Sequence, residues 1–147
     1  GALYLTGASK SPTIITPHAG ELAELLKVES AKIEAEPIYY ALDAARRFKV
    51  TVLLKGNKTV VANENRVIQL PAATSWLATA GTGDVLAGIL GALLALNHEV
   101  VNKENLIELG ATASYIHAQS AAHSSKGPIE AGKMIEHVTK VVTQLSK

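Results

Sequence analysis

The stretch that decides the fold of this chain reads Leu77-Ala78-Thr79-Ala80-Gly81-Thr82-Gly83-Asp84-Val85-Leu86-Ala87-Gly88. Gly81 and Gly83 allow the backbone to approach a ligand closely and to adopt conformations that a side chain would prevent. The helix that we expect to open here presents unpaired amide groups and the positive end of its dipole, and both stabilise a bound phosphate. The stretch is neither a Walker A loop nor a dinucleotide-binding fingerprint, because it lacks the Lys-Ser/Thr ending and the third glycine at the required spacing.

Asp84 is the unusual residue of this stretch, because a carboxylate at the start of a helix would repel a phosphate bound there. The helix dipole stabilises the carboxylate itself, so its position is physically reasonable. One economical role is to remove a proton from an acceptor hydroxyl, with the carboxylate directed at that hydroxyl. The spacing equally allows Asp84 to do no more than cap the helix.

Outward from this stretch, the pattern of apolar residues predicts strands and helices in alternation. We expect strands at 13–16, 50–54, 59–62 and 66–70, and helices at 21–27, at 38–48, from 81 onward, at 105–123 and at 130–145. The second strand is short and, apart from Thr51, apolar, as in the interior of a parallel sheet, and the Asn-Glu-Asn sequence at 63–65 suits a hairpin loop. This order predicts an α/β layered fold, with a mostly parallel sheet, an antiparallel hairpin and flanking helices.

A second motif, Thr16-Pro17-His18-Ala19-Gly20-Glu21, follows the first expected strand. Ligands collect at the carboxyl ends of strands in open α/β sheets. His18 and Glu21 flank a small Ala-Gly pair, so both side chains are candidates to point into one crevice. The alternative is a plain helix start, with a proline in its first turn and an exposed histidine.

A third motif, Leu54-Lys55-Gly56-Asn57-Lys58-Thr59, begins at the end of the second expected strand. A lysine in this place, with glycine after it, is positioned to contact a nucleotide phosphate or ribose; the alternative is a polar hairpin turn. Among the other histidines, His117 lies on an apolar helix face and is expected to pack. His98, His123 and His137 share no spacing typical of a metal site.

Composition limits the classes of function. The 147 residues suffice for one domain, and their net charge of +1 gives no sign of a nucleic-acid or membrane-surface binder. The absence of cysteine excludes disulfides, thiol catalysis and zinc–thiolate sites. The longest apolar run, 85–96, contains two glycines and is too short to span a bilayer, and the first residues lack the pattern of a signal peptide. We therefore expect a cytoplasmic protein.

Together and in this order, the motifs at 16–21, 54–59 and 78–88 resemble the ribokinase-like superfamily. More narrowly, the chain resembles the ADP- or ATP-dependent NAD(P)H-hydrate dehydratases, whose members carry Thr-Pro-His-x-Gly-Glu, Leu-Lys-Gly-x-x-Thr and Ala-Thr-x-Gly-Thr-Gly-Asp-Val-Leu-x-Gly. Vitamin kinases of the superfamily usually have asparagine where this chain has His18. The histidine therefore favours the dehydratase branch.

The resemblance implies a role for each motif. It implies contacts to ADP or ATP from Lys55, Gly56, Asn57, Lys58 and Thr59 and from Gly81, Thr82 and Gly83. It implies contacts to hydrated NADH or NADPH from His18 and Asp84, and places Glu21 near Mg²⁺ and phosphate. Asp84 would deprotonate the hydroxyl of the hydrate, which would attack a nucleotide phosphoryl group, and elimination of phosphate would restore the dihydronicotinamide. The alternatives are a small-molecule or vitamin kinase and a non-catalytic nucleotide-binding fragment.

The chain departs from the family pattern in two places. Residues 71–76, Pro71 to Trp76, replace an Asn-x-Thr-Gly-like stretch, although Trp76 could stack on a base or ring. Gly1-Ala2-Leu3 resembles the remainder of an interrupted aspartate-rich motif. We therefore expect residues 1–147 to be the C-terminal portion of a ribokinase-like domain whose N-terminal half is absent. Its partner would be a separate N-terminal half or another copy of the chain.

Overall fold

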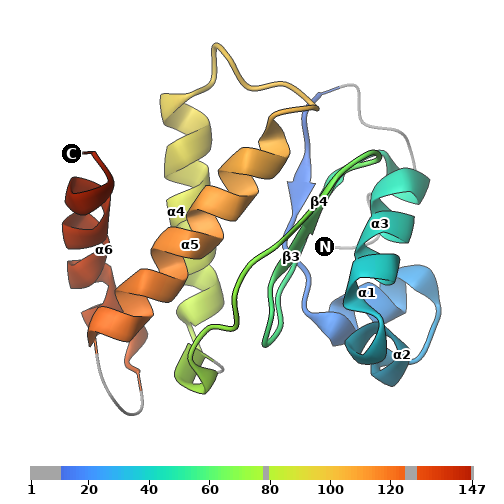
Figure 1. Ribbon diagram of the computed structural model, residues 1–147, viewed down its shortest axis with the longest axis horizontal. Helices are drawn as coiled ribbons and strands as arrows, with labels where there is room; N and C mark the ends of the chain where they lie inside the picture. The colour runs from blue at the N-terminus through green and yellow to red at the C-terminus, as the bar shows by residue number, and fades with distance from the viewer. Residues whose placement is uncertain (1–10, 78–79, 125–128, 147) are drawn as a thin grey trace.

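The computed structural model describes residues 11–77, 80–124 and 129–146, except for the side chain of Trp76. These residues form three layers, with a small sheet between two groups of helices (Figure 1). Every expected strand and helix is present, with its expected ends shifted by at most two residues. The α/β layered architecture predicted from the sequence is confirmed.

The sheet has the strand order β1-β2-β3-β4. Its strands are β1 (Ile14–Ile15), β2 (Thr51–Leu54), β3 (Val60–Ala62) and β4 (Val67–Gln69). Only β1 and β2 pair in parallel in the described chain, whereas β2–β3 and β3–β4 are antiparallel. The expected mostly parallel sheet is therefore corrected to a mixed one over these residues, because two successive hairpins supply two of the three strand pairs. The Asn63 side chain closes the second hairpin by accepting the backbone N–H groups of Asn65 and Arg66.

Three helices cover one face of the sheet: α1 (Ala19–Leu26), α2 (Ser30–Ala35) and α3 (Pro37–Phe48). The short α2 was not expected, because Ile33 is its one large apolar residue and gives no helical period. Lys27 and Lys49 end α1 and α3 in the left-handed conformation. This αL ending is a common way for the chain to leave a helix.

The opposite face carries α4 (Thr82–Leu96), α5 (Leu106–Ser124) and α6 (Ala131–Leu145), with a short 3-10 turn, η2 (Ser75–Leu77), before α4. Gly110 lets α5 lie close to the sheet, because a Cβ there would be 3.0 Å from side-chain atoms of both Ile14 and Val61. No helix within the described ranges is both long enough and apolar enough to cross a bilayer.

Strand β2 joins the two halves of the core. Val52 and Leu54 pack with the helices of the first face, and Leu53 packs with those of the second. Alternate side chains of a strand point to opposite faces. A strand covered on both faces is therefore mostly apolar, which explains the apolar residues Val52 to Leu54; Thr51, at its start, is buried as well.

Candidate functional site

The second and third motifs lie side by side at the carboxyl edge of the parallel strand pair. A parallel bridge joins His18 to Lys55, and the Lys55 N–H donates to the Pro17 carbonyl at 2.8 Å. Both residues directly follow the strands that the sheet aligns. The backbone alone thus brings together two motifs that are about 40 residues apart in the sequence.

His18 and Glu21 form a reciprocal capping box at the start of α1. The His18 N–H donates to Glu21 Oε2 at 2.7 Å, and the Glu21 N–H donates to His18 Nδ1 at 3.2 Å. Because Nδ1 is an acceptor, the proton of a neutral His18 ring lies on Nε2. A Cβ on Gly20 would lie 3.0 Å from the ring carbon Cε1, so glycine makes room for this ring orientation. His18 is therefore the N-cap of α1, and its side chain is exposed, as the alternative of a plain helix start also expects.

Glu21 also meets the third motif. Its Oε2 lies 3.7 Å from Lys55 Nζ. Partial burial raises the pKa of Glu21, but the hydrogen bond from the His18 backbone and the positive charge of Lys55 outweigh burial and leave the pKa lowered. Glu21 is consequently a carboxylate near neutral pH.

The glycine stretch joins the same cluster through Lys55. A Cβ built on Gly83 would lie 3.8 Å from Lys55 Nζ, so the ammonium lies against the first turn of α4. Gly81, at φ 86°, is the N-cap of this helix. A residue with a side chain is strained in that conformation. All three motifs therefore converge on Lys55.

Asp84 lies in the first turn of α4, one residue beyond Gly83. It is exposed, and its carboxylate makes no hydrogen bond or ion pair with any residue that the structure describes. Asp84 therefore makes no capping hydrogen bond with the described residues, although its place in the first turn still suits the helix dipole. The carboxylate is available to an incoming molecule.

A cavity of about 570 Å³ lies on the side of Lys55 that faces α1 and α2. Among its lining residues are His18, Lys55, Gly56, Asn57 and Lys58 from the motifs, with Ile33, Pro37 and Gln69 beside them. Thr59 lies next to it in sequence but not in its lining; its carbonyl accepts the Leu70 N–H at 2.9 Å. The turn 55–58 lines this cavity, whereas no residue of α4 does.

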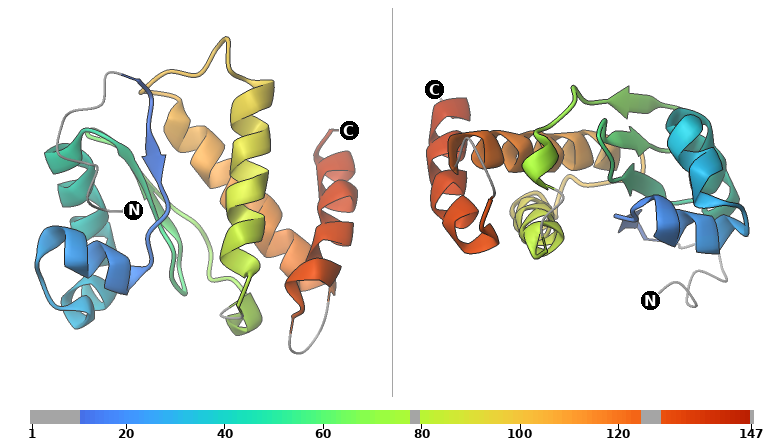
Figure 2. Two further views of the ribbon diagram at one scale, coloured as in Figure 1. Left: turned by 180° about the vertical axis from the view of Figure 1, so that it is seen from behind. Right: turned by 90° about the horizontal axis from the view of Figure 1, so that it is seen from below.

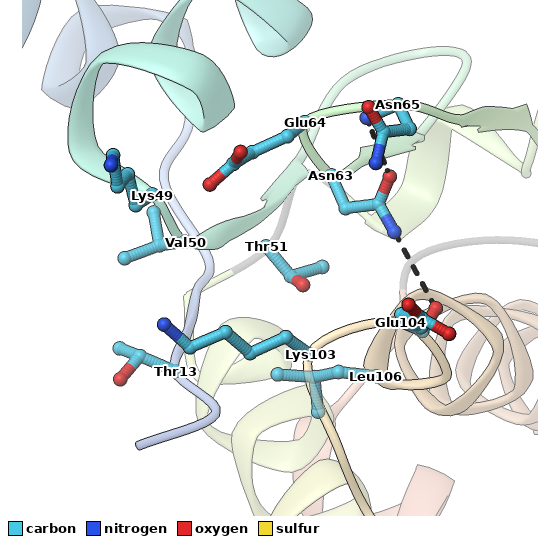
Figure 3. Close-up of a pocket in the computed structure, with 10 residues that line it drawn as sticks. All are labelled: Thr13, Lys49, Val50, Thr51, Asn63, Glu64, Asn65, Lys103, Glu104 and Leu106. Atoms are coloured by element: carbon cyan, nitrogen blue, oxygen red, sulfur yellow. Dashed lines mark hydrogen bonds between the residues drawn. The ribbon is translucent and has the colours of Figure 1, made fainter. Parts of the chain in front are cut away.

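A second cavity, of about 210 Å³, lies at the opposite end of the strands and contains none of the expected site residues (Figure 3). Lys49 and Glu64 line it from one side, and Lys103 and Leu106 from the other. Asn63 crosses between the two sides by donating to the Glu104 carbonyl at 3.4 Å. Because ligands of α/β sheets collect at the carboxyl ends of strands, the cluster at Lys55 is the stronger candidate.

The start of α4 is held by contacts that sequence reasoning missed. The Thr82 hydroxyl donates to the Leu77 carbonyl, and His117 Nε2 donates to the Thr82 carbonyl, each at 2.7 Å. His117 was expected only to pack, and it is indeed buried. Burial lowers its pKa, although the hydrogen bond to Thr82 opposes the shift, so the ring is neutral near pH 7. The single clue to this contact in the sequence was a histidine on an otherwise apolar helix face.

Some residues of the expected site lie outside the described part of the chain. Ala78 and Thr79 of the glycine motif, the side chain of Trp76 and the segment Gly1 to Leu3 belong to this group. The backbone of the preceding loop is tied to the site nonetheless, because the Ala73 N–H donates to the Asn57 carbonyl at 3.2 Å.

Comparison with known proteins assigns this arrangement to a family. The NAD(P)H-hydrate dehydratase family model matches residues 3–142. The chain belongs to this family. The bifunctional NAD(P)H-hydrate repair enzyme Nnr of Mycobacterium leprae is 37% identical over 142 residues, which are 92% of this chain and 28% of that enzyme. The ADP-dependent (S)-NAD(P)H-hydrate dehydratase of Neisseria meningitidis is 43% identical over 83 residues, 56% of this chain and 28% of that enzyme.

Solved structures of the dehydratase family give the same result. The ADP/ATP-dependent NAD(P)H-hydrate dehydratase of Bacillus subtilis, co-crystallised with ATP and Mg²⁺, superposes with a TM-score of 0.79 at 26% identity, over 90% of this chain and 48% of that one. The chain thus spans about half of that dehydratase and a little over a quarter of the curated relatives above.

Proposed function

We propose that this chain supplies the nucleotide-binding and catalytic part of an enzyme that dehydrates hydrated NADH and NADPH at the expense of ADP or ATP. The observation that carries the proposal is the position of Lys55 Nζ, between the Glu21 carboxylate and Gly83. The three motifs of the dehydratase pattern are dispersed over the sequence. Around Lys55 they form one cluster of charges at a helix N-terminus.

In this proposal the nucleotide phosphates bind at the start of α4, beside the Lys55 ammonium. The ammonium supplies a positive charge, and the first amides of α4 supply donors together with the positive end of the helix dipole. Gly81 and Gly83 keep side chains out of this space. Such fixed donors stabilise charge that develops on a phosphoryl group during transfer.

Asp84 is the general base in this proposal. It removes the hydroxyl proton of the hydrate as the hydroxyl oxygen bonds to the terminal phosphorus, and the bond from phosphorus to the bridging oxygen of the nucleotide breaks. ADP becomes AMP, or ATP becomes ADP. Phosphate then leaves the ring with the electron pair of its C–O bond while the neighbouring carbon loses a proton, which restores the dihydronicotinamide. The exposed, unpaired carboxylate of Asp84 suits the first step.

His18 and Glu21 complete the site. His18 lines the cavity next to Lys55 and presents Nε2, its protonated nitrogen, as a donor for the substrate. Glu21 fits a role in holding Mg²⁺ jointly with the phosphates, because magnesium is typically bound by one or two carboxylates plus substrate phosphates. No group of three acidic or histidine side chains forms a ready-made metal site within the described residues. A bound Mg²⁺ would neutralise phosphate charge.

The proposed function is tested by the near-ultraviolet absorbance of dihydronicotinamide. Hydrated NADH is mixed with Mg²⁺, ADP or ATP, and the longest natural form of the protein. We expect the absorbance to return with wild type and with Asp43→Asn, which changes the other aspartate of the chain, but to return about 10²–10⁴-fold more slowly with Asp84→Asn. No return with either nucleotide would overturn the assignment.

The same reaction separates the alternatives. A vitamin kinase would leave a stable phosphorylated product, whereas the dehydratase releases inorganic phosphate together with the reduced cofactor. A non-catalytic remnant would bind the nucleotide but give neither product, even when the rest of the protein is supplied.

We also propose that the chain forms a C-terminal portion that needs a second half. Among the described strands β1 is at the edge of the sheet, and it lies on the same side of the molecule as α4 (Figure 2). Small apolar residues are exposed on α4: Ala87, Gly88, Gly91, Ala92 and Ala95. An open strand edge next to an apolar helix face is the type of surface that another part of a protein covers. Coverage of about half of the solved dehydratase supports this reading.

A further inference from the structure

We propose that His117 is a positioning residue, which orients the Gly83 amide toward the bound nucleotide by holding the Thr82 carbonyl. This inference rests on the proposed function, because it takes the nucleotide phosphates to lie at the start of α4. It adds a residue 35 positions beyond Thr82, on another helix.

The peptide bond between Thr82 and Gly83 links the two groups. The Thr82 carbonyl and the Gly83 N–H belong to the same peptide unit, which is planar and trans, so they point in opposite directions. His117 Nε2 lies 2.7 Å from the carbonyl oxygen and therefore fixes the orientation of both groups. With the carbonyl directed to the interior of the protein, the Gly83 N–H is directed away from it.

The restraint adds to that of helix α4, because Gly83, the second residue of the helix, has no side chain to limit its backbone. Glycine has access to more of the backbone dihedral space than any other residue. Gly83 is exposed, and no side chain anchors it. Donors that stabilise developing charge must already be in place when the reaction occurs. An external restraint on the peptide plane supplies that order without a side chain that would block the ligand.

His117 itself is well held. It lies within α5, is 9% exposed, and belongs to the layer in which α5 packs against α4. The other end of Thr82 is also fixed, since its hydroxyl donates to the Leu77 carbonyl at 2.7 Å. The first residue of α4 is thus restrained by α5 through its main chain and by η2 through its side chain.

The protonation state of the ring fits this role. Burial lowers the pKa of His117, so the imidazole is neutral at pH 7, and a carbonyl acceptor requires its one proton on Nε2. The ring therefore donates one hydrogen bond and adds no positive charge beside Lys55. An amide donor of similar reach should replace it, whereas an apolar side chain of similar size should not.

Two substitutions separate positioning from packing. His117→Gln retains a donor, and His117→Leu retains the bulk but loses the donor; His123→Leu, on the exposed side of the same helix, is the control. Each is made in the longest natural form of the protein. The measurements are the melting temperature, the NMR order parameter of the Gly83 amide, the Kd for MgADP, and kcat and KM for hydrated NADH.

We expect His117→Leu to lower the Gly83 order parameter and to raise the Kd for MgADP about 10-fold, with His117→Gln within about 3-fold of wild type. The two variants should differ in this way even where their melting temperatures agree. Equal weakening of MgADP binding in both variants, or none in His117→Leu, would overturn the proposal. Because the order parameter and the MgADP titration need no turnover, the test remains decisive if the dehydratase assignment fails.

Discussion

Lys55 Nζ lies 3.7 Å from Glu21 Oε2 and 3.8 Å from the position that a Cβ on Gly83 would occupy. The ion pair is partly exposed, with the Lys55 side chain 31% accessible, so it contributes little to the stability of the fold. Its consequence is positional, because it holds a cation next to a helix N-terminus. That arrangement predicts a loss of nucleotide affinity without a loss of folding when the charge is removed.

Substitution of Lys55 tests this prediction. We expect Lys55→Met to raise the Kd for MgADP about 10- to 100-fold, since a hydrogen bond to a charged group contributes about 1.5–3 kcal/mol. The melting temperature should change by only a few degrees. Lys140→Met on the exposed surface of α6 is the matched control. Calorimetric titration gives the answer, and unchanged affinity in Lys55→Met would remove Lys55 from the site.

The capping box makes a prediction for acid stability. The lowered pKa of Glu21 means that its contribution to stability is fully present above the ordinary value of 4.5 and is lost as the pH falls through the lower value of the folded state. Glu21→Ala should cost about 1 kcal/mol at pH 7 and should flatten this acid limb. Urea unfolding between pH 7 and pH 3 measures both effects. Glu24→Ala, on the same helix, should cause neither change.

His117 predicts a second dependence of the folding stability on pH, in a higher pH range than that of Glu21. Its pKa is lowered in the folded protein, so below the ordinary value of 6.5 the unfolded chain binds a proton that the folded chain does not. Stability should therefore fall as the pH drops below 6.5, by up to about 1.4 kcal/mol per pH unit from this group. The free energy of unfolding in His117→Gln should show a smaller decrease over that range. An identical decrease in both proteins would show that another group causes it.

Two helix glycines should respond to alanine in opposite directions. Gly110→Ala places a Cβ 3.0 Å from Ile14 and Val61 side-chain atoms, so we expect a loss of about 1–3 kcal/mol through overpacking. A Cβ on Gly91 meets nothing within 4 Å, and Gly91→Ala should stabilise this chain by about 0.5–1 kcal/mol. Denaturant melts of the two variants provide the comparison. A gain in Gly110→Ala would show that α5 does not lie as close to the sheet as described.

The exposed surface beside β1 predicts association. We expect this chain alone to self-associate or to bind an apolar dye, and a form that includes the other half to do so much less. Size-exclusion chromatography with dye fluorescence distinguishes these states. A monodisperse and fully active monomer of this chain would contradict the proposal of a missing half.

Local sequence patterns predicted most of the fold, and the exceptions have physical causes. The run at 50–54 and the asparagine-flanked loop at 63–65 identified a buried strand and a hairpin, because side-chain alternation and turn chemistry are local properties. Helix α2 was missed because six residues with one large apolar side chain carry no period. The sheet was expected to be mostly parallel, and this expectation failed for a physical reason. The direction of a strand depends on the strands with which it pairs, and no local pattern specifies those partners.

The sequence by itself determined the residue types of the site: glycines where a backbone must approach a ligand, a lysine after a buried strand, and an aspartate at the start of a helix. Only the tertiary structure decided how they meet. It directed His18 and Glu21 into a capping box, placed Lys55 between Glu21 and Gly83, and joined His117 to Thr82. Chemical identity is a property of each residue, whereas distance across the fold depends on the packing of α1, α4 and α5 around one edge of the sheet.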